Sequence, residues 1–300
     1  MPRGDRMSAA TETERAAGEE GLAAYRFILT VLAYAVPFVF ILLPLILFLI
    51  QSFYYVEDGN IVHQLTLRNY ERFFAGRGFV PVFFNTILLC LGVAAITVLF
   101  GYPIAYLLAS LRGRRKYVMM VVFVVPLMMS YIIKIYAIRA ILGGNGFLNR
   151  ILLYLGVVDE PLTFLIFNLK AVLVTLSIIL LPFAVLPIFI ALERIPRSVV
   201  DASADLGASA FRSFRDIVWP LSVQGTIVGA TFVFVLALGD FITPQMVGGM
   251  SGFTFGRIIY SQFGFAFNWP FGAALSVILL VVVLVAIVGT GLITRARHQL

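Results

Sequence analysis

The chain has 300 residues, of which 61% are hydrophobic and 12% are charged, and its formal net charge is +7. Soluble domains are about half apolar and about one quarter charged, so a soluble fold of this length could not bury so much apolar surface. The composition therefore indicates a membrane protein, and the basic residues lie between apolar segments rather than along one face, which argues against nucleic-acid binding.

The N-terminal residues 1–26 are polar and poor in aromatic side chains, which predicts a disordered tail. The apolar segment that follows begins near Phe27 and is too long for the core of a signal peptide. We therefore expect an uncleaved first span, followed by a transmembrane domain that extends over residues 27–300.

Six segments contain the roughly 20 mostly apolar residues that a helix needs to cross hydrocarbon. They predict an all-α polytopic membrane protein with six transmembrane helices. Lys134 and Arg139 interrupt the third segment, and Asp240 interrupts the fifth. The predicted spans are Phe27–Phe53, Val82–Ser110, Tyr117–Ile141, Thr163–Ala191, Ser222–Val247 and Phe271–Thr294.

The short connections carry Lys and Arg unevenly. If both termini face the cytoplasm, the inner segments 1–26, 112–116, 194–215 and 295–297 hold fourteen of these residues, and the outer segments hold five. Cytoplasmic loops carry the excess of Lys and Arg. The bias predicts a multi-pass membrane protein with cytoplasmic N- and C-termini.

The longest outer loop, residues 54–81, contains Leu67, Tyr70, Phe73 and Phe74 at helical spacing. This pattern predicts a short helix, which lies either at the membrane surface as an amphipathic element or packed as an ordinary loop helix.

The inner loop 192–221 is far longer than a connection between two helices requires. Ser198 could cap a short helix that runs to Leu206, and Gly207 suits the left-handed position that ends a helix. An amphipathic stretch then leads to Pro220 and back into lipid. A polar helix–glycine–helix elbow of this kind favours contact with a partner protein.

The elbow resembles the EAA loop of permeases in binding-protein-dependent ABC importers. That pattern begins with an acidic and two small residues and ends in Ile, one variable residue, Leu and Pro. Trp219 stands here at the Leu position, Asp replaces Glu, and Ser replaces the second Ala. The matching positions, expected to couple to the ATPase, are Asp201, Ala202, Ser203, Gly207, Ile217 and Pro220.

The resemblance implies a permease domain of the type I importer (MetI-like) fold, with a coupling helix seated on a cytoplasmic ATPase dimer. It also implies a place in the bacterial inner membrane, a second permease subunit, homologous but not identical, and a periplasmic solute-binding protein. ATP and magnesium would be bound by the ATPase, because none of the three lysines here follows a glycine, as a phosphate-binding loop requires. We expect no enzyme activity, cofactor or metal site in this chain.

Softer similarities point to the spermidine/putrescine permease branch. They include Ser130–Ala137, Gly146–Asn149, Leu181–Phe183 and Ala237–Phe241. Relatives in this branch also move opines, phosphonates, thiamine and ferric iron. A polyamine is therefore the expected solute, and an anionic or zwitterionic solute is the alternative.

Charged residues inside spans are costly and usually face a cavity or a partner. On straight helices, Lys134 and Asp240 would both lie about 25 Å above the inner ends of their spans. Asp240 then either forms an ion pair with Lys134 or lines the translocation path, where it would attract an ammonium group. The candidate path residues are Asp240, Lys134, Tyr136 and Pro244.

Two other classes of function remain as alternatives. An ion-driven secondary transporter would ordinarily show paired repeats with broken helices, and it would leave the inner loop without a purpose. An intramembrane enzyme has little support, because the chain has two histidines and no carboxylate pair within its spans.

Overall fold

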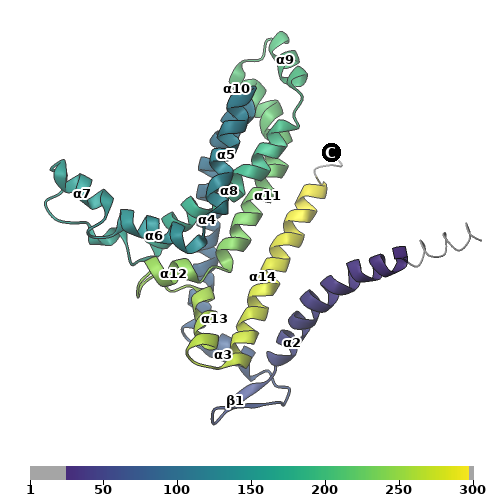
Figure 1. Ribbon diagram of the computed structural model, residues 1–300, viewed down its shortest axis with the longest axis vertical. Coiled ribbons are helices and arrows are strands. Elements are labelled where there is room, and N and C mark those ends of the chain that lie inside the picture. The colour runs from purple at the N-terminus through teal and green to yellow at the C-terminus, as the bar shows by residue number, and fades with distance from the viewer. Residues whose placement is uncertain (1–24, 297–300) are drawn as a thin grey trace, which may run out of the picture.

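The computed structural model describes residues 25–296 of the chain. The predicted disordered tail thus lies outside the described residues, except for Tyr25 and Arg26, which already belong to the first long helix. The predicted all-α class is confirmed, with the addition of one small hairpin that the sequence analysis missed (Figure 1). This hairpin joins β1 (Tyr55–Glu57) to the antiparallel β2 (Asn60–Val62).

Within residues 25–296, five helices are long and apolar enough to cross a membrane, and a sixth crossing exists if one bent pair is counted as a single span. The first, Tyr25–Gln51, contains a π turn, η1 (Phe38–Leu42), and ends with α2 (Leu43–Gln51). The others are α4 (Phe79–Ser110), the bent pair, α8 (Leu169–Glu193), the continuous helix Ala210–Leu238, and α14 (Trp269–Ala296).

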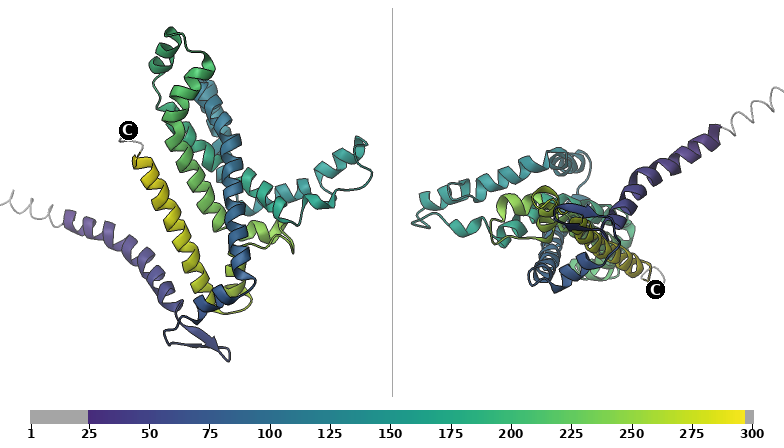
Figure 2. Two further views of the ribbon diagram at one scale, coloured as in Figure 1. Left: turned by 180° about the vertical axis from the view of Figure 1, so that it is seen from behind. Right: turned by 90° about the horizontal axis from the view of Figure 1, so that it is seen from below.

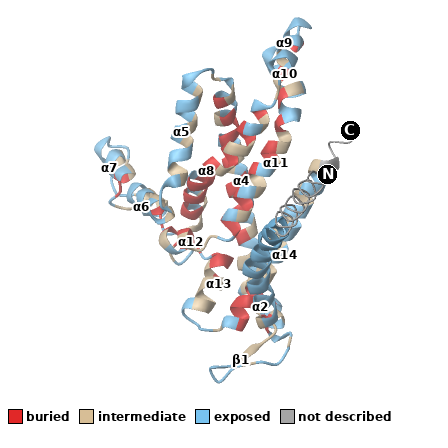
Figure 3. Ribbon diagram, turned by 45° about the vertical axis from the view of Figure 1, so that its right-hand side comes forward, coloured by how far each residue is buried: buried red, intermediate tan, exposed pale blue. Residues whose placement is uncertain are grey.

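The core of the molecule lies between α4, α8 and α11 (Trp219–Leu238), which pack side by side along most of their lengths (Figures 1 and 3). Small residues allow this approach, as is usual for helices in lipid. A Cβ on Gly225 of α11 would lie 2.4 Å from the Cβ of Ala191, and one on Gly229 would lie 2.9 Å from the carbonyl oxygen of Ala184. Both partners belong to α8, so the close packing of α8 and α11 depends on these two glycines.

The two ends of the core carry different elements (Figure 1). At one end, which we call the elbow end, α9 (Arg197–Asp205) and α10 (Ala210–Ser213) project beyond the core. The opposite end, the hairpin end, carries the hairpin, α3 (Arg68–Ala75) and α13 (Phe255–Gly264). Here Phe73, Phe255 and Phe271 are buried in one aromatic cluster.

The predicted helix in the outer loop is confirmed as α3. Phe73 is buried, whereas Leu67 and Phe74 are exposed. The buried Asn69 side chain donates hydrogen bonds to the carbonyl oxygens of Ser52 and Tyr54. The helix is therefore held against the protein by one buried face, and its other face leaves Leu67 and Phe74 exposed.

The prediction of a straight third span is wrong. α5 (Arg114–Met128) and α6 (Tyr131–Leu142) are separated by a break at Met129 and Ser130, and the bent pair, which runs on to Tyr154, turns by 98°. Pro126 lies in the last turn of α5, where its ring removes a backbone donor. α6 therefore runs nearly perpendicular to α5. The depth of Lys134 in the membrane, which was calculated for a straight helix, is wrong for this reason.

Beyond this break, α6 and α7 (Phe147–Tyr154) form an arm that extends sideways from the core (Figures 1 and 2). Arg139 of α6 lies over the ring of Phe167, with 5.5 Å between the guanidinium carbon and the ring centroid. A single turn, η2 (Thr163–Leu165), connects the arm to α8. The fourth span thus begins at Leu169, later than predicted, and α8 continues through Pro182 and Pro187 without a break.

The fifth span also differs from its predicted bounds. The helix begins at Ala210, and the π turn η3 (Phe214–Val218) carries it into α11 past Pro220. It ends at Leu238, before α12 (Ile242–Val247). The inner half of the elbow is therefore one continuous helix with the span.

The first long helix is the least covered part of the described chain. Its side chains are exposed from Tyr25 to Ile50 (Figure 3). It contacts α14, and the ring of Phe48 packs edge-on against that of Phe263 in α13. An apolar helix of this kind requires lipid or another subunit around it.

Candidate coupling elbow and polar junction

The elbow comprises α9, the turn 206–209 and α10, that is, Arg197–Ser213. α9 ends in a Schellman motif: the amide of Gly207 donates to the carbonyl oxygen of Ala204 at 2.9 Å, and the amide of Ala208 donates to that of Ser203 at 3.0 Å. Gly207 has φ +82°, which confirms the predicted left-handed conformation. The predicted Ser198 cap is wrong, because α9 begins at Arg197, one residue earlier.

Ser203 and Ser213 join the two arms of the elbow. Their hydroxyl oxygens lie 2.6 Å apart, and both residues are buried. The Ser203 hydroxyl also donates to the carbonyl oxygen of Val200 at 2.7 Å, which leaves Ser213 as the donor between the two. The side chain of Ser209 accepts the amide of Arg212 and caps α10. These bonds fix the angle between α9 and α10.

The outer surface of the elbow is open and partly apolar. Leu206 is 89% exposed, and Phe211 is 72% exposed. Asp201 and Ala202 are exposed on α9. The tip of this polar projection therefore presents two large apolar side chains to its surroundings.

The inner arm of the elbow, α10, is anchored in the core through the helix that continues it, η3 and α11. Val218 is buried among residues of α4 and α8, and Phe214 packs edge-on against the ring of Tyr102. The Tyr102 hydroxyl lies 2.7 Å from that of Ser222, in a buried contact between α4 and α11. A displacement of the elbow must therefore move α11 with it.

The predicted coupling residues fall into two groups. In the first group, Asp201 and Ala202 are exposed on α9, and Gly207 is exposed at the turn. Ser203 belongs to the same group and makes the hydroxyl contact with Ser213. In the second group, Ile217 lies in η3 and Pro220 in α11, on the helix that continues α10 into the core. The sequence analysis assigned no role to Ser213. The only available signal was that a small residue at this position could face the small Ser203 across the elbow.

A second polar group forms where two helices break. Asp240 lies between α11 and α12, and one oxygen of its carboxylate accepts the amides of Ile242 and Thr243 at 3.0 and 3.4 Å. The other oxygen accepts the hydroxyl of Tyr131 at 2.9 Å. The Tyr131 and Thr243 hydroxyls are 3.0 Å apart. We call Tyr131, Asp240 and Thr243 the polar junction.

Of the two alternatives for Asp240, the ion pair with Lys134 is wrong. Within the described residues, the ion pairs are Lys116–Glu193, Arg212–Asp216 and Arg215–Asp216. The Lys134 ammonium lies 5.6 Å from the centroid of the Tyr131 ring. The 98° bend turns α6 away from the direction that the pairing assumed, and neutral donors satisfy Asp240 instead.

The candidate path residues do not line one common cavity. Lys134 lines a cavity of about 310 Å³ between α5, α6 and α8. Tyr136 lines a different one, of about 560 Å³, within the arm. Pro244 is buried in α12, next to the polar junction. No role had been predicted for Tyr131 or Thr243, because their meeting with Asp240 depends on the two breaks.

The chain matches the family described as binding-protein-dependent transport system inner membrane component over residues 101–297. The chain belongs to this family. The match includes the elbow and the polar junction, so both features lie within the segment that defines the family.

Named relatives extend the similarity to most of the chain. The spermidine/putrescine transport system permease protein PotB of Escherichia coli (strain K12) is 35% identical over 260 residues, which cover 85% of this chain and 92% of the relative. PotB of Haemophilus influenzae (strain ATCC 51907 / DSM 11121 / KW20 / Rd) is 31% identical, covering 79% of this chain and 83% of the relative.

The fold also has solved counterparts. A bacterial ABC transporter involved in the import of the acidic polysaccharide alginate contains a chain with a TM-score of 0.71 and 16% identity, covering 94% of this chain and 99% of that one. At this identity the likeness establishes the fold alone. The predicted importer-permease fold is thereby confirmed.

Proposed function

We propose that this chain is one permease subunit of an ATP-driven importer that takes up spermidine and putrescine. The observation that carries the proposal is the 35% identity to the permease PotB over 85% of the chain. PotB is named as part of a spermidine/putrescine transport system. The permease itself performs no covalent chemistry in this scheme; it supplies half of a path that changes its accessibility.

The elbow couples the path to the motor. Its exposed tip, with Leu206 and Phe211, seats on an ATPase subunit, and closure of the ATPase dimer displaces it. Because α10, η3 and α11 form one continuous helix, the displacement reaches the polar junction at the far end of α11. A rigid helix between two contacts is a suitable lever for switching between inward-open and outward-open states.

The proposed orientation places the elbow end and both termini in the cytoplasm. It rests on fourteen Lys and Arg residues in the inner segments against five in the outer ones. The hairpin end then faces the periplasm and meets a solute-binding protein. A second, homologous permease completes the path and covers part of the exposed first helix.

The polar junction supports a cationic solute. Asp240 accepts three hydrogen bonds, all from neutral donors, and among the residues the structure describes it has no cationic partner. Its negative charge is thus uncompensated within the described part of the chain, and an ammonium group of a polyamine would compensate it. We propose that Asp240 contacts the solute, that Pro244 supports α12 beneath it, and that Lys134 and Tyr136 lie farther along the path.

Uptake of radiolabelled spermidine tests the proposal in cells that express the chain with its partner subunits. We expect saturable uptake that putrescine inhibits, that ATP depletion abolishes, and that an uncoupler alone spares. Uptake that survives ATP depletion but collapses with an uncoupler would indicate a secondary transporter. Inhibition by opines or phosphonates, with no effect of putrescine, would instead favour an anionic or zwitterionic solute.

A further inference from the structure

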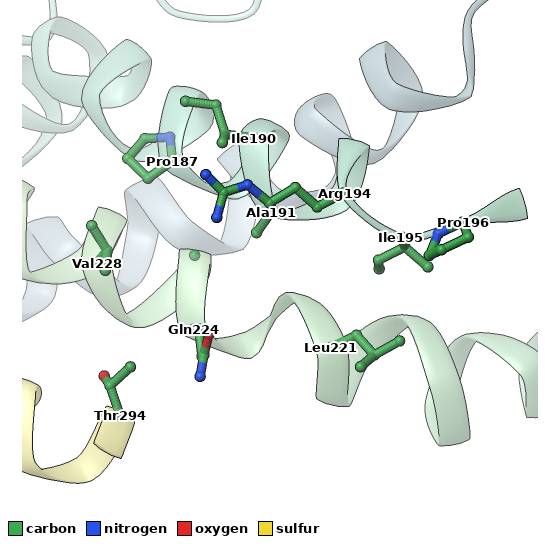
Figure 4. Close-up of a pocket in the computed structure, with 11 residues that line it drawn as sticks. Pro187, Ile190, Ala191, Arg194, Ile195, Pro196, Leu221, Gln224, Val228 and Thr294 are labelled. Atoms are coloured by element: carbon green, nitrogen blue, oxygen red, sulfur yellow. The ribbon is translucent and has the colours of Figure 1, made fainter. Parts of the chain in front are cut away.

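Two neighbouring cavities lie along α8, α11 and α14 near the elbow end. The first has a volume of about 550 Å³, and its polar lining comes from Arg194, Gln224 and Thr294 (Figure 4). The second has a volume of about 500 Å³ and lies between α11 and α14. They share Val228 and Thr294 as lining residues, so they form one continuous groove.

The second cavity is almost wholly apolar. Its lining includes Ile227, Phe232 and Leu236 of α11 and Ile287 of α14. The groove is open because α14 packs on the core only as far as Ala286. Beyond that point, a Cβ on Gly291 would have no atom within 4 Å. The groove is therefore elongated and mostly apolar, with the charged side chain of Arg194 at one end.

Arg194 supplies the charge at the head of the groove. Its guanidinium extends back over Ala191 toward Pro187, that is, toward the apolar part of the cavity (Figure 4). A long basic side chain near a membrane surface ordinarily extends toward water. Among the residues the structure describes, no carboxylate forms an ion pair with Arg194. The amide of Gln224 lies on the facing helix and adds a neutral donor (Figure 4).

The length and the charge of the groove indicate what could fill it. Ile227 and Leu236 are about 14 Å apart along α11, close to the ~15 Å hydrocarbon depth of one leaflet. An acyl chain matches this length and the apolar lining of the second cavity. The cationic Arg194 at the head of the groove favours an occupant whose head group is anionic.

We propose that this groove binds an anionic phospholipid, with the phosphate at Arg194 and Gln224 and one acyl chain between α11 and α14. The lipid would belong to the cytoplasmic leaflet, an assignment that rests on the orientation proposed above. Because it bridges the elbow end of α8 to α11 and α14, the lipid stabilises the helices that the elbow moves.

Native mass spectrometry of the full-length chain, purified with the subunits that accompany it, tests lipid binding without transport. We expect phosphatidylglycerol to be retained in preference to phosphatidylcholine. R194Q should weaken phosphatidylglycerol retention by about tenfold, the effect of losing one charge-assisted hydrogen bond. G291F should prevent retention of either lipid, because its ring fills the groove while its Cβ meets no protein atom within 4 Å.

Two matched variants control this experiment. R115Q removes an exposed arginine of α5 that does not line the groove, and G289F adds a ring on α14 where a Cβ also meets nothing within 4 Å. Both should retain phosphatidylglycerol as the unmodified protein does. Equal retention of the two lipids, or full retention by R194Q or G291F, would overturn the proposal.

A photo-crosslinking residue in place of Phe232 provides a second measurement. Capture of phospholipid in native membranes supports the proposal, and capture of a second polypeptide in place of lipid overturns it. Neither readout depends on ATP or on solute. A failure of polyamine uptake therefore leaves the lipid result intact, and a failure of lipid binding leaves the proposed function intact.

Discussion

The elbow and the polar junction lie at opposite ends of one helix and are built in opposite ways. The elbow has an exposed tip, and its internal hydrogen bonds join residues at most ten positions apart. In the polar junction, Tyr131 and Asp240 are 109 positions apart. The elbow is thus formed by residues close together in the sequence, and it exposes a surface. The polar junction is formed only by the tertiary fold, and it contains the charged Asp240.

Because of this difference, substitutions in the two regions should impair different steps of transport. A change in the elbow should impair communication with a partner while the membrane core stays folded. A change in the junction should alter what passes through the path, with its effect divided between charge and packing. The following predictions separate these two outcomes.

Deletion of Ala202–Gly207 should have the largest effect. It removes the last turn of α9 and the left-handed turn, so the elbow can no longer seat on the ATPase. We expect uptake at background level with normal abundance in the membrane fraction, measured by radiolabelled uptake and immunoblotting. Undiminished uptake by this variant would contradict the coupling role.

The Asp240→Asn substitution should lower uptake of a cationic solute by about tenfold or more, as expected for loss of a hydrogen bond between charged groups. Asn can still accept the amides of Ile242 and Thr243, so the start of α12 is preserved. Tyr131→Phe is the matched control, because it removes one hydrogen bond and keeps the carboxylate. Equal losses in both variants would indicate a structural role for Asp240 rather than a role of its charge.

The Gly207→Val substitution should reduce uptake several-fold. At φ +82° a β-branched residue is strained by about 1–2 kcal/mol, and no neighbouring atom lies within 4 Å of an added Cβ, so strain is the only cost. Gly207→Asn tests this reasoning, since Asn tolerates the left-handed conformation and should retain most uptake. If both variants transport like the unmodified chain, the turn geometry is not required.

The smallest effect is expected for the hydroxyl pair inside the elbow. Ser203→Ala and Ser213→Ala should each destabilise the protein, and a double-mutant cycle should give a coupling energy of about 1 kcal/mol. Thermal unfolding of the purified protein measures it. Additive effects of the two substitutions would show that the hydroxyl contact does not hold α9 to α10.

The sequence predicted the elbow well because its structure depends on neighbours along the chain. Glycine at the end of a short helix adopts the left-handed conformation through local hydrogen bonds, and Gly207 does so. The capping role of Ser198 was misassigned because the boundary of a short helix depends on one or two residues of context, here Pro196. The coupling roles themselves stay predictions.

The positions of the helix breaks could not be predicted in the same way. Lys134 and Arg139 suggested a weak third span, yet the chain turns earlier, at Met129 and Ser130. Conversely, α8 contains Pro182 and Pro187 and continues through both, because the buried packing of α4 and α11 against it favours the helix. Proline removes one donor locally, but neighbouring helices decide whether the chain bends.

By itself, the sequence determined that the chain is a helical membrane protein, how many apolar segments it has, and where the elbow lies. These properties follow from transfer free energies and backbone preferences, which belong to each segment separately. Only the tertiary structure decided that Asp240 meets Tyr131 rather than Lys134, and that a groove opens between α11 and α14. Such contacts depend on the angles at which helices cross, and packing between distant segments sets those angles.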